Sequence, residues 1–436
     1  MSRRTQSVSS RGRRRHLSPF LALEGATLLS ALGNGVAMVA MPWLVLELTG
    51  DAAAAGLVAG VTALPMLLSS LFSGTLVDRF GRRRTSVVSD LLSAVSAAGI
   101  PLVAITGDLT FGWVLGLAVL GSVFDPAGVT ARESMLPDVA AAAKLPVRRV
   151  NGIHEAVWGL AYLIGPAVGG LLIAFVGAVE ALWLMSAGFF ASSALLALVR
   201  VPGAGRPRAA DRPALWAGTV EGLRFVWHDP VLRSVTMLST AFVAIAYPIL
   251  GVVLPYVFEQ VDQPQRLGVL LMAFSLGSIV GALGYSGIGH RLPQRASFVV
   301  GMVGNAAVMA WFAIDPPFAL LVAGAVVGGL STGPINPIVN SALQQRTPET
   351  LRGRVMGVLV SVAYGVVPLG YLVGGVLVQR FGAEVTFVLA TLVSVVLVVA
   401  TVRNRGLHAI DHHVDLLEEA AAATSAQDDS VSCSPG

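Results

Sequence analysis

The chain has 436 residues, 55% of them hydrophobic and only 12% charged, which is about half the charged fraction of a typical soluble domain. Its apolar residues lie in long uninterrupted runs, each close to the roughly 20 residues that a helix needs to cross a bilayer. Such runs exclude a soluble globular fold, and because they lack the alternation of barrel strands they also exclude a membrane β-barrel. The sequence therefore predicts an all-α membrane protein.

Twelve apolar segments follow one another along the chain, and each predicts one transmembrane helix. They lie at residues 20–48, 53–77, 85–106, 111–131, 152–173, 181–200, 232–257, 268–289, 297–314, 318–340, 355–379 and 384–402. The first segment is long and lacks a small-residue cleavage site, so we expect a retained helix and not a signal peptide. These positions divide the chain into a basic tail (1–19), a six-helix bundle (20–200), a linker ending in an amphipathic helix (201–231), a second six-helix bundle (232–402) and a polar tail (403–436).

Basic residues predict the orientation, because cytoplasmic loops are enriched in Lys and Arg. With twelve helices both termini lie on one side, and 27 of the 29 Lys and Arg residues fall on that side. Only Arg266 and Arg380 fall on the other side, whose short loops are acidic. We therefore expect a multi-pass protein of the bacterial plasma membrane with the termini, the linker and both tails in the cytoplasm. Since the basic residues are spread over many loops, they do not indicate nucleic-acid binding.

The two predicted bundles carry traces of a duplication. Glycines in and just after the fifth segment recur 205 residues later in and just after the eleventh, and Asp125-Pro126 of the fourth recurs as Asn336-Pro337 in the tenth. The recurring glycines are Gly165, Gly169, Gly170 and Gly177, with counterparts Gly370, Gly374, Gly375 and Gly382. Parallel repeats of this kind predict two bundles that rock against each other around a central cavity.

The loop between the second and third segments carries the most specific motif, Gly74-Thr-Leu-Val-Asp78-Arg79-Phe-Gly81-Arg82. It resembles the signature loop of the major facilitator superfamily, which implies that family's fold. The resemblance also implies a conformational latch, in which Asp78 binds the start of the eleventh helix at residues 353–355 and closes the cytoplasmic side. Gly81 permits the tight turn, and a carboxylate at a helix N-terminus gains about 0.3 to 1 kcal/mol.

The fifth segment contains a second motif of small residues, namely Gly152, Ala161, Gly165, Pro166, Gly169 and Gly170. Small residues four apart allow two helices to approach until their backbones touch. The motif resembles the one that marks the antiporter branch of the superfamily, with Ala161 in place of a glycine. This resemblance implies export.

Three further stretches resemble the subgroup of macrolide and enterobactin exporters: Met41–Gly50, Glu221–Trp227 and Gly353–Val355. One feature departs from the pattern of well-known drug antiporters, which have an arginine within the fourth helix linked to proton transfer. The fourth predicted segment, 111–131, contains no basic residue.

A charge within a transmembrane helix costs about 2.5 to 3.5 kcal/mol, and three acidic residues of the predicted helices qualify as candidates for proton coupling: Glu24, Asp90 and Asp125. Glu24 shares a helix face with Thr27, Asn34 and Met38, and Asn34 and Met38 are candidates for substrate binding, although Glu24 is also close enough to the predicted helix end to reach the interface. Asp90 could equally make a structural pair with the basic loop. Asp125 precedes a proline and favours a break in the helix over proton transfer.

The sequence predicts no enzyme, cofactor or metal site. The seven histidines are expected at helix ends, in loops or in tails: His16, His154, His228, His290, His408, His412 and His413. The run from Asp411 to His413 is better explained as a solvated tail than as a metal site, and the only cysteine, Cys433, lies in the same tail. No Gly-x-x-x-x-Gly-Lys loop indicates direct use of ATP.

The resulting interpretation is a monomeric secondary transporter in the lipid bilayer. It would export a small amphiphilic compound, such as a drug, an antibiotic or a siderophore, by alternating access in exchange for protons. Two alternatives stay open: uptake by symport, and a membrane receptor or assembly partner that does not transport. An intact Asp78 loop argues against the second, since a static scaffold has no use for a latch.

Overall fold

The computed structural model describes residues 17–198, 215–348 and 351–411, without the side chains of residues 66–75, 78, 215–219, 290 and 353. Over these residues the chain consists of helices joined by short turns, and no strand occurs in them. The first half contains six helices: α1 (Ser18–Thr49), α2 (Ala52–Phe80), α3 (Arg82–Thr106), α4 (Phe111–Ala143), α5 (Val147–Val176) and α6 (Ala178–Leu198). Within this half, α1 packs against α5 and α6, and α3 packs against α4 and α6.

The second half begins with α7 and is more often interrupted. Its elements are α7 (Leu215–His228), α8 (Pro230–Pro248), a π-helical turn (Ile249–Val253), α9 (Leu254–Glu259), α10 (Pro264–Ile288), a 3₁₀ turn (Gly289–Arg291), α11 (Gln294–Ala313), α12 (Phe318–Thr332), α13 (Ile335–Arg346), α14 (Arg352–Gly365) and α15 (Val367–Arg403). The predicted amphipathic helix of the linker is observed as α7. It lies against the start of α14, where Glu221 forms an ion pair with Arg354.

Ten helical stretches of the described residues are long and apolar enough to cross a membrane. One of them, Arg354–Arg403, has 50 residues, about twice the length of a single crossing. It is interrupted at Gly382, whose φ is 78°. The remaining helix of the first half, α2, is apolar over Ala52–Pro65. The number twelve stays a prediction, which requires Arg354–Arg403 to cross twice and α2 to cross once.

The proposed repeat has a counterpart in the backbone. Gly177, at the end of α5, has a φ of 95°, and its predicted partner Gly382 has a φ of 78°. Both values lie in the region that favours glycine, because a Cβ atom is strained there. The two halves therefore use the same residue in the same conformation to turn the chain at equivalent positions.

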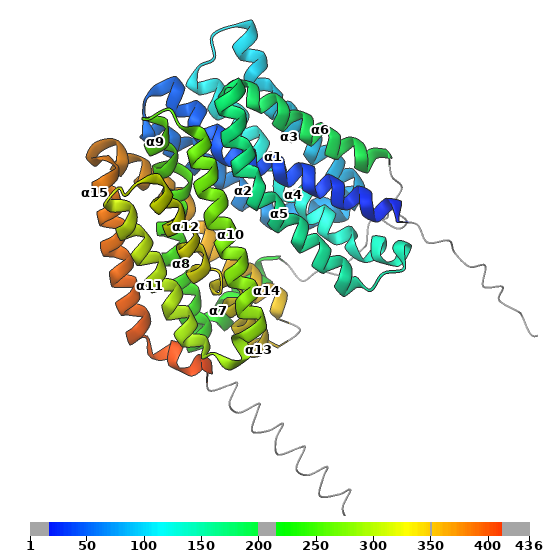
Figure 1. Ribbon diagram of the computed structural model, residues 1–436. Coiled ribbons are helices and arrows are strands. Elements are labelled where there is room, and N and C mark those ends of the chain that lie inside the picture. Colours follow the sequence, from blue (N-terminus) through cyan, green and yellow to red (C-terminus); the bar gives the residue numbers. More distant parts are fainter. Residues whose placement is uncertain (1–16, 199–214, 349–350, 412–436) are drawn as a thin grey trace, which may run out of the picture.

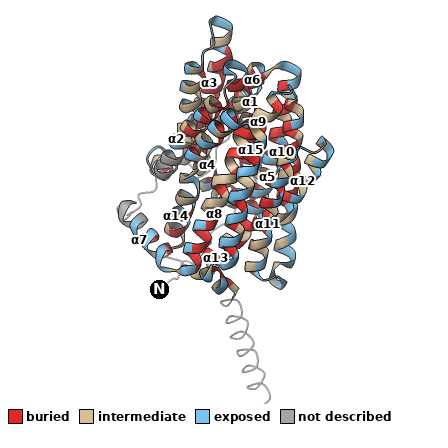
Figure 2. Ribbon diagram, turned by 90° about the vertical axis from the view of Figure 1, so that its left-hand side faces the viewer, coloured by how far each residue is buried: buried red, intermediate tan, exposed pale blue. Residues whose placement is uncertain are grey.

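Each helix presents one face to its neighbours and another to the outside. Buried and exposed residues alternate around the same helices (Figure 2), and α15 exposes large apolar side chains such as Leu392, Val393 and Val396. In water such a surface would be an unfavourable large apolar patch, whereas lipid tails are as apolar as these side chains and pack against them without that cost. The exposed faces are therefore consistent with a protein surrounded by lipid.

The two halves touch near the connections at residues 50–51 and 177, which we call the far end. The opposite end, where α1 begins and α15 finishes, is the terminus end. At the far end the backbone N–H of Ala52 on α2 donates to Gln379 on α15 at 2.7 Å. Gly170 on α5 lies directly against the backbone of Pro264 on α10. From this contact the halves diverge toward the terminus end (Figure 1).

The start of the C-terminal tail packs one face against the second half, whereas Arg405 and His408 are exposed. Residues 405–411 are helical, and Leu407 and Ile410 are buried against the second half. Asp411 accepts a hydrogen bond of 2.7 Å from the backbone N–H of Gln294 at the start of α11. Residues 405–411 therefore form a short helix that packs on one face, because two apolar side chains one turn apart find a buried surface. The polar tail over 403–436 stays a prediction. Residues 412–436, with His412, His413 and Cys433, lie outside the described residues.

Candidate functional site

Glu24 and His154 meet in the interior of the first half. Glu24 on α1 is 6% exposed and His154 on α5 is 3% exposed. The Nδ1 atom of His154 lies 3.2 and 3.3 Å from the two carboxylate oxygens of Glu24. Although Glu24 is near the start of α1, its carboxylate therefore points to another helix and not to the membrane surface.

Trp158 extends this contact by one residue. Its indole N–H donates to Nε2 of His154 at 3.2 Å. An indole can only donate, so Nε2 must offer its lone pair, and the proton of the neutral imidazole is then on Nδ1. The Nδ1–H group then donates a hydrogen bond to the carboxylate of Glu24. The three residues thus form a chain of hydrogen bonds with one defined tautomer of histidine.

The expectation that every histidine lies at a helix end, in a loop or in a tail is wrong for His154. The fifth helix begins at Val147, five residues before the predicted start at 152, so His154 lies in its third turn. The sequence held a usable signal, because Val150, His154 and Ala161 follow a helical spacing of four and seven residues. All three are buried on one face of α5.

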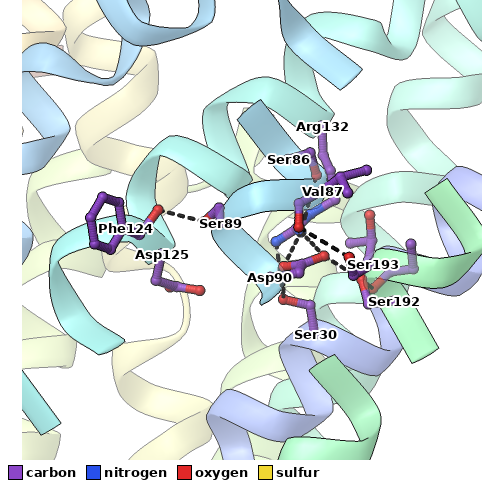
Figure 3. Close-up of polar contacts among 12 residues, drawn as sticks. Ser30, Ser86, Val87, Ser89, Asp90, Phe124, Asp125, Arg132, Ser192 and Ser193 are labelled. Carbon is purple, nitrogen blue, oxygen red and sulfur yellow. Dashed lines mark hydrogen bonds and ion pairs between the residues drawn. The ribbon is translucent and has the colours of Figure 1, made fainter. Parts of the chain in front are cut away.

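Asp90 on α3 is neutralised by a buried arginine (Figure 3). Its carboxylate oxygens lie 2.8 and 3.0 Å from Nη1 of Arg132 on α4. The hydroxyl of Ser192 on α6 donates to Asp90 at 2.6 Å, and that of Ser30 on α1 donates at 3.3 Å. Asp90 and Arg132 are each 1% exposed. This cluster joins four helices and favours the structural role expected for Asp90, because protonation would leave a buried guanidinium without its counter-charge.

The fourth helix is longer than predicted and contains the basic residue Arg132. The sequence predicts that this helix ends at 131 and contains no basic residue, with Arg132 in the following loop. Instead α4 continues to Ala143, and Arg132 is buried within it and donates to Ser30 at 3.1 Å. The apolar run stops at 131, but a helix continues wherever its polar side chains find partners in the protein interior.

Asp125 on α4 lies apart from the Asp90 cluster (Figure 3). Its two carboxylate oxygens each lie 3.3 Å from the amide nitrogen of Asn34 on α1, which donates to them. Two of the predicted site residues are thus brought together. Met38, one turn further along α1, is partly buried.

The predicted helix break at Asp125 is wrong. Pro126 lies inside a continuous α4. In the second half the break occurs between α12 and α13, at Gly333 and Pro334, shortly before the repeat partner Asn336. The helix break therefore occurs at a Gly-Pro pair and not at an Asp-Pro or Asn-Pro pair. Asp125 lies on an intact helix, and its carboxylate has a polar role there.

Three tyrosines from the two halves lie near one another, and one of them is near Asp125. Tyr162 on α5 is within electrostatic reach of Asp125 and of Tyr364 on α14. Tyr247 on α8 donates a hydrogen bond of 3.1 Å to Tyr364, and their rings meet edge to face with centroids 5.6 Å apart. Tyr162 and Tyr364 remain 49% and 42% exposed. Exposed rings around a carboxylate can bind flat amphiphilic compounds, and cations in particular.

The loop motif is described only in part. Gly81 has a φ of 87° and separates α2 from α3, which confirms the tight turn. Arg82 forms an ion pair of 2.6 Å with Asp138 on α4 and donates to the carbonyl of Ser134. Arg79 is exposed. Gly74 lies within α2, but its surroundings and the side chain of Asp78 are outside the described part of the structure, so the latch stays a prediction.

The small residues of α5 hold it between two helices. Gly165 lies against Gly35 of α1, so that a Cβ atom on Gly165 would be 2.7 Å from the Cα of Gly35. On another face a Cβ atom on Gly268 of α10 would be 2.7 Å from the carbonyl oxygen of Pro166. Ala161 is fully buried, whereas a Cβ atom on Gly152 would meet nothing within 4 Å. The predicted close approach of helices is therefore present, and it includes a helix of the other half.

Comparison with known proteins gives similarities along most of the chain. The family described as "Transmembrane secretion effector" matches residues 17–426. The protein named "Multidrug efflux pump Tap" of Mycobacterium tuberculosis (strain ATCC 25618 / H37Rv) is 42% identical over 390 residues, which cover 88% of this chain and 93% of that protein. "Enterobactin exporter EntS" of Salmonella typhimurium is 26% identical over 383 residues, covering 86% and 88%.

A solved structure shares the fold at low sequence identity. The crystal structure of the nucleoside transporter NupG superposes with a TM-score of 0.74 and 14% identity, over 88% of this chain and 98% of that one. At this identity the likeness concerns the arrangement of helices alone.

Proposed function

This chain belongs to the family of transmembrane secretion effectors, and on that premise we propose that it exports a small amphiphilic compound in exchange for protons. It is an efflux transporter with the major facilitator fold, which confirms the resemblance seen in its motifs. The name of the relative from Mycobacterium tuberculosis supports drugs or antibiotics as cargo, and the name of EntS supports a siderophore.

The observation that carries the proton exchange is the contact between Glu24 and His154. Both groups are buried, and both can gain or lose a proton. Asp90 differs, because its partner is an arginine that stays charged at every relevant pH. Glu24 and His154 therefore form a site whose charge can change without leaving a permanent buried cation behind.

Cargo binding is proposed for the region around Asp125. Asn34 holds the carboxylate in place, and Tyr162 brings an exposed aromatic ring within its electrostatic reach. Tyr364 adds a ring from the other half. The contacts of a compound bound between the two halves would change whenever the halves move relative to each other. Alternating access requires this link between binding and the position of the halves.

We further propose that the terminus end faces the cytoplasm, as the distribution of Lys and Arg supports. The observed contact of the halves at the far end then corresponds to a state that is closed outward. In such a state the latch of Asp78 would be released, and it would form when the cytoplasmic side closes. One chain contains both halves, so we propose a monomer as the working unit.

Transport into inside-out membrane vesicles tests this function. A panel of drugs, antibiotics and siderophores is offered at the cytoplasmic face, and an acidic vesicle lumen is imposed in the absence of ATP. At least one compound should accumulate in vesicles that contain the chain, and a protonophore should abolish the accumulation. Accumulation that is indifferent to the protonophore would refute proton exchange, and none across the panel would refute the cargo class.

A further inference from the structure

Three side chains in a row on α5 connect two groups of residues. The first is the proton site, Glu24 and His154, and the second is the aromatic surface formed by the rings of Tyr162, Tyr247 and Tyr364. His154, Trp158 and Tyr162 are spaced four residues apart, so they lie one above the other on a single helix face. The indole of Trp158 donates to His154 at 3.2 Å. The ring of Trp158 also stacks on Tyr162, with centroids 5.7 Å apart and an angle of 25° between the planes.

The hydrogen bond to Trp158 exists in only one protonation state of His154. It requires a lone pair on Nε2, because the indole nitrogen is a donor only. If a proton is added to Nε2, two donors face each other and the bond is lost. If the proton goes to Glu24 and the carboxyl group donates to Nδ1, the histidine must carry its proton on Nε2, with the same result. In both cases, adding a proton to Glu24 and His154 breaks the hydrogen bond between the Trp158 indole and His154.

Charged groups of three helices lie near His154. Glu24 approaches from α1, and Glu133 on α4 lies within electrostatic reach of His154. Glu133 is in turn within reach of Glu155 on α5 and of Arg132. Arg132 is held by Asp90. Among Glu24, His154 and Glu133, His154 is the member that contacts Trp158.

We infer that Trp158 transmits the protonation state of Glu24 and His154 to the aromatic surface that receives the cargo. With the pair unprotonated, the indole is fixed by His154 and supports the ring of Tyr162. With a proton bound, the indole is released and the stack with Tyr162 is no longer held in position. This inference rests on the proposed function, and it makes Trp158 a positioning residue that acts through Tyr162.

The intrinsic fluorescence of Trp158 tests the inference without any cargo. A protonated imidazole in contact quenches an indole more strongly than a neutral one. The emission of Trp158 is obtained as the difference between the parent protein and Trp158→Phe in lipid nanodiscs. It should fall severalfold when the pH is lowered from about 8 to about 5 and protons are loaded onto the pair. Trp183→Phe on α6 is the control, and its difference signal should not change with pH.

Two variants locate the proton. His154→Gln keeps an acceptor for the indole but cannot bind a proton, so it should abolish the fall in emission. Glu24→Gln removes the carboxylate that faces the imidazole, so at the same acidic pH the emission should fall less than in the parent. A Trp158 emission that is constant with pH, or that responds in the same way in His154→Gln, would overturn the inference.

Transport then separates the inference from the proposed function. Trp158→Phe keeps an aromatic ring to stack on Tyr162 but lacks the N–H group. Its vesicles should exchange cargo across the membrane at the parental rate and lose most of the accumulation driven by the proton gradient. Parental accumulation in Trp158→Phe refutes the inference and leaves the proposed function intact. If the parent itself fails to accumulate any compound, the proposed function fails, and the fluorescence result still decides whether the switch exists.

Discussion

Gly35 on α1 and Gly165 on α5 are in backbone contact, since a Cβ atom on Gly35 would lie 2.8 Å from the Cα of Gly165. This contact fixes the distance between two helices that each carry one member of the proposed proton site. Glu24 lies three turns before Gly35 on α1, and His154 lies three turns before Gly165 on α5. The same crossing therefore sets how closely the carboxylate approaches the imidazole.

Replacing Gly165 by leucine should separate α1 from α5. Overpacking of this kind typically costs about 1–3 kcal/mol, so we expect a lower temperature of unfolding in detergent and a lower abundance in the membrane. Gly152→Leu is the matched control on the same helix, because a Cβ atom there meets nothing within 4 Å. Equal stability of the two variants would show that the contact does not hold the helices together.

Replacing Asp90 by asparagine should destabilise the first half. Removing one member of a buried ion pair typically costs about 3–5 kcal/mol, because Arg132 would keep its charge without a partner. The double variant Asp90→Leu with Arg132→Met should recover part of this loss. Thermal unfolding of the purified variants measures both effects. If Asp90→Asn were as stable as the parent but failed to use a proton gradient, Asp90 would be the proton carrier.

The fold could largely be predicted from the sequence because apolar runs and helical crossings have the same length. The site could be predicted only in part. Glu24, Asn34 and Asp125 were found because an acid or an amide in an apolar run has few explanations. Arg132 and His154 were missed because they lie where an apolar run ends, and hydropathy alone cannot tell an interior partner from a loop residue. Only packing reveals that α4 and α5 extend past these ends.

The latch makes a separate prediction. Asp78→Asn removes the charge that a helix N-terminus can hold, so transport in vesicles should fall strongly while abundance in the membrane stays near that of the parent. Arg84→Gln is the control, since Arg84 is an exposed residue in the first turn of α3, close to Asp78 in the sequence. Unchanged transport in Asp78→Asn would reduce the loop to a signal for orientation.

Orientation can be tested with reporter fusions. A reporter placed after Gly205 or at the C-terminus should be active in the cytoplasm, and one placed near Asp315 should be active outside, because nearly all Lys and Arg residues fall on the side of the termini. A cytoplasmic signal near Asp315 would contradict the number of twelve crossings.

The most direct test of proton exchange compares Glu24→Gln with the parent in vesicles that have an imposed proton gradient. Each proton moved inward supplies about 2.3 kcal/mol per 100 mV of membrane potential in addition to the pH term, and glutamine permanently mimics the protonated form. We predict that Glu24→Gln still exchanges labelled cargo across the membrane but no longer accumulates it, whereas the parent does both. If Glu24→Gln accumulates cargo as the parent does and Asp125→Asn does not, the proton is carried on α4 and the assignment to Glu24 and His154 is contradicted.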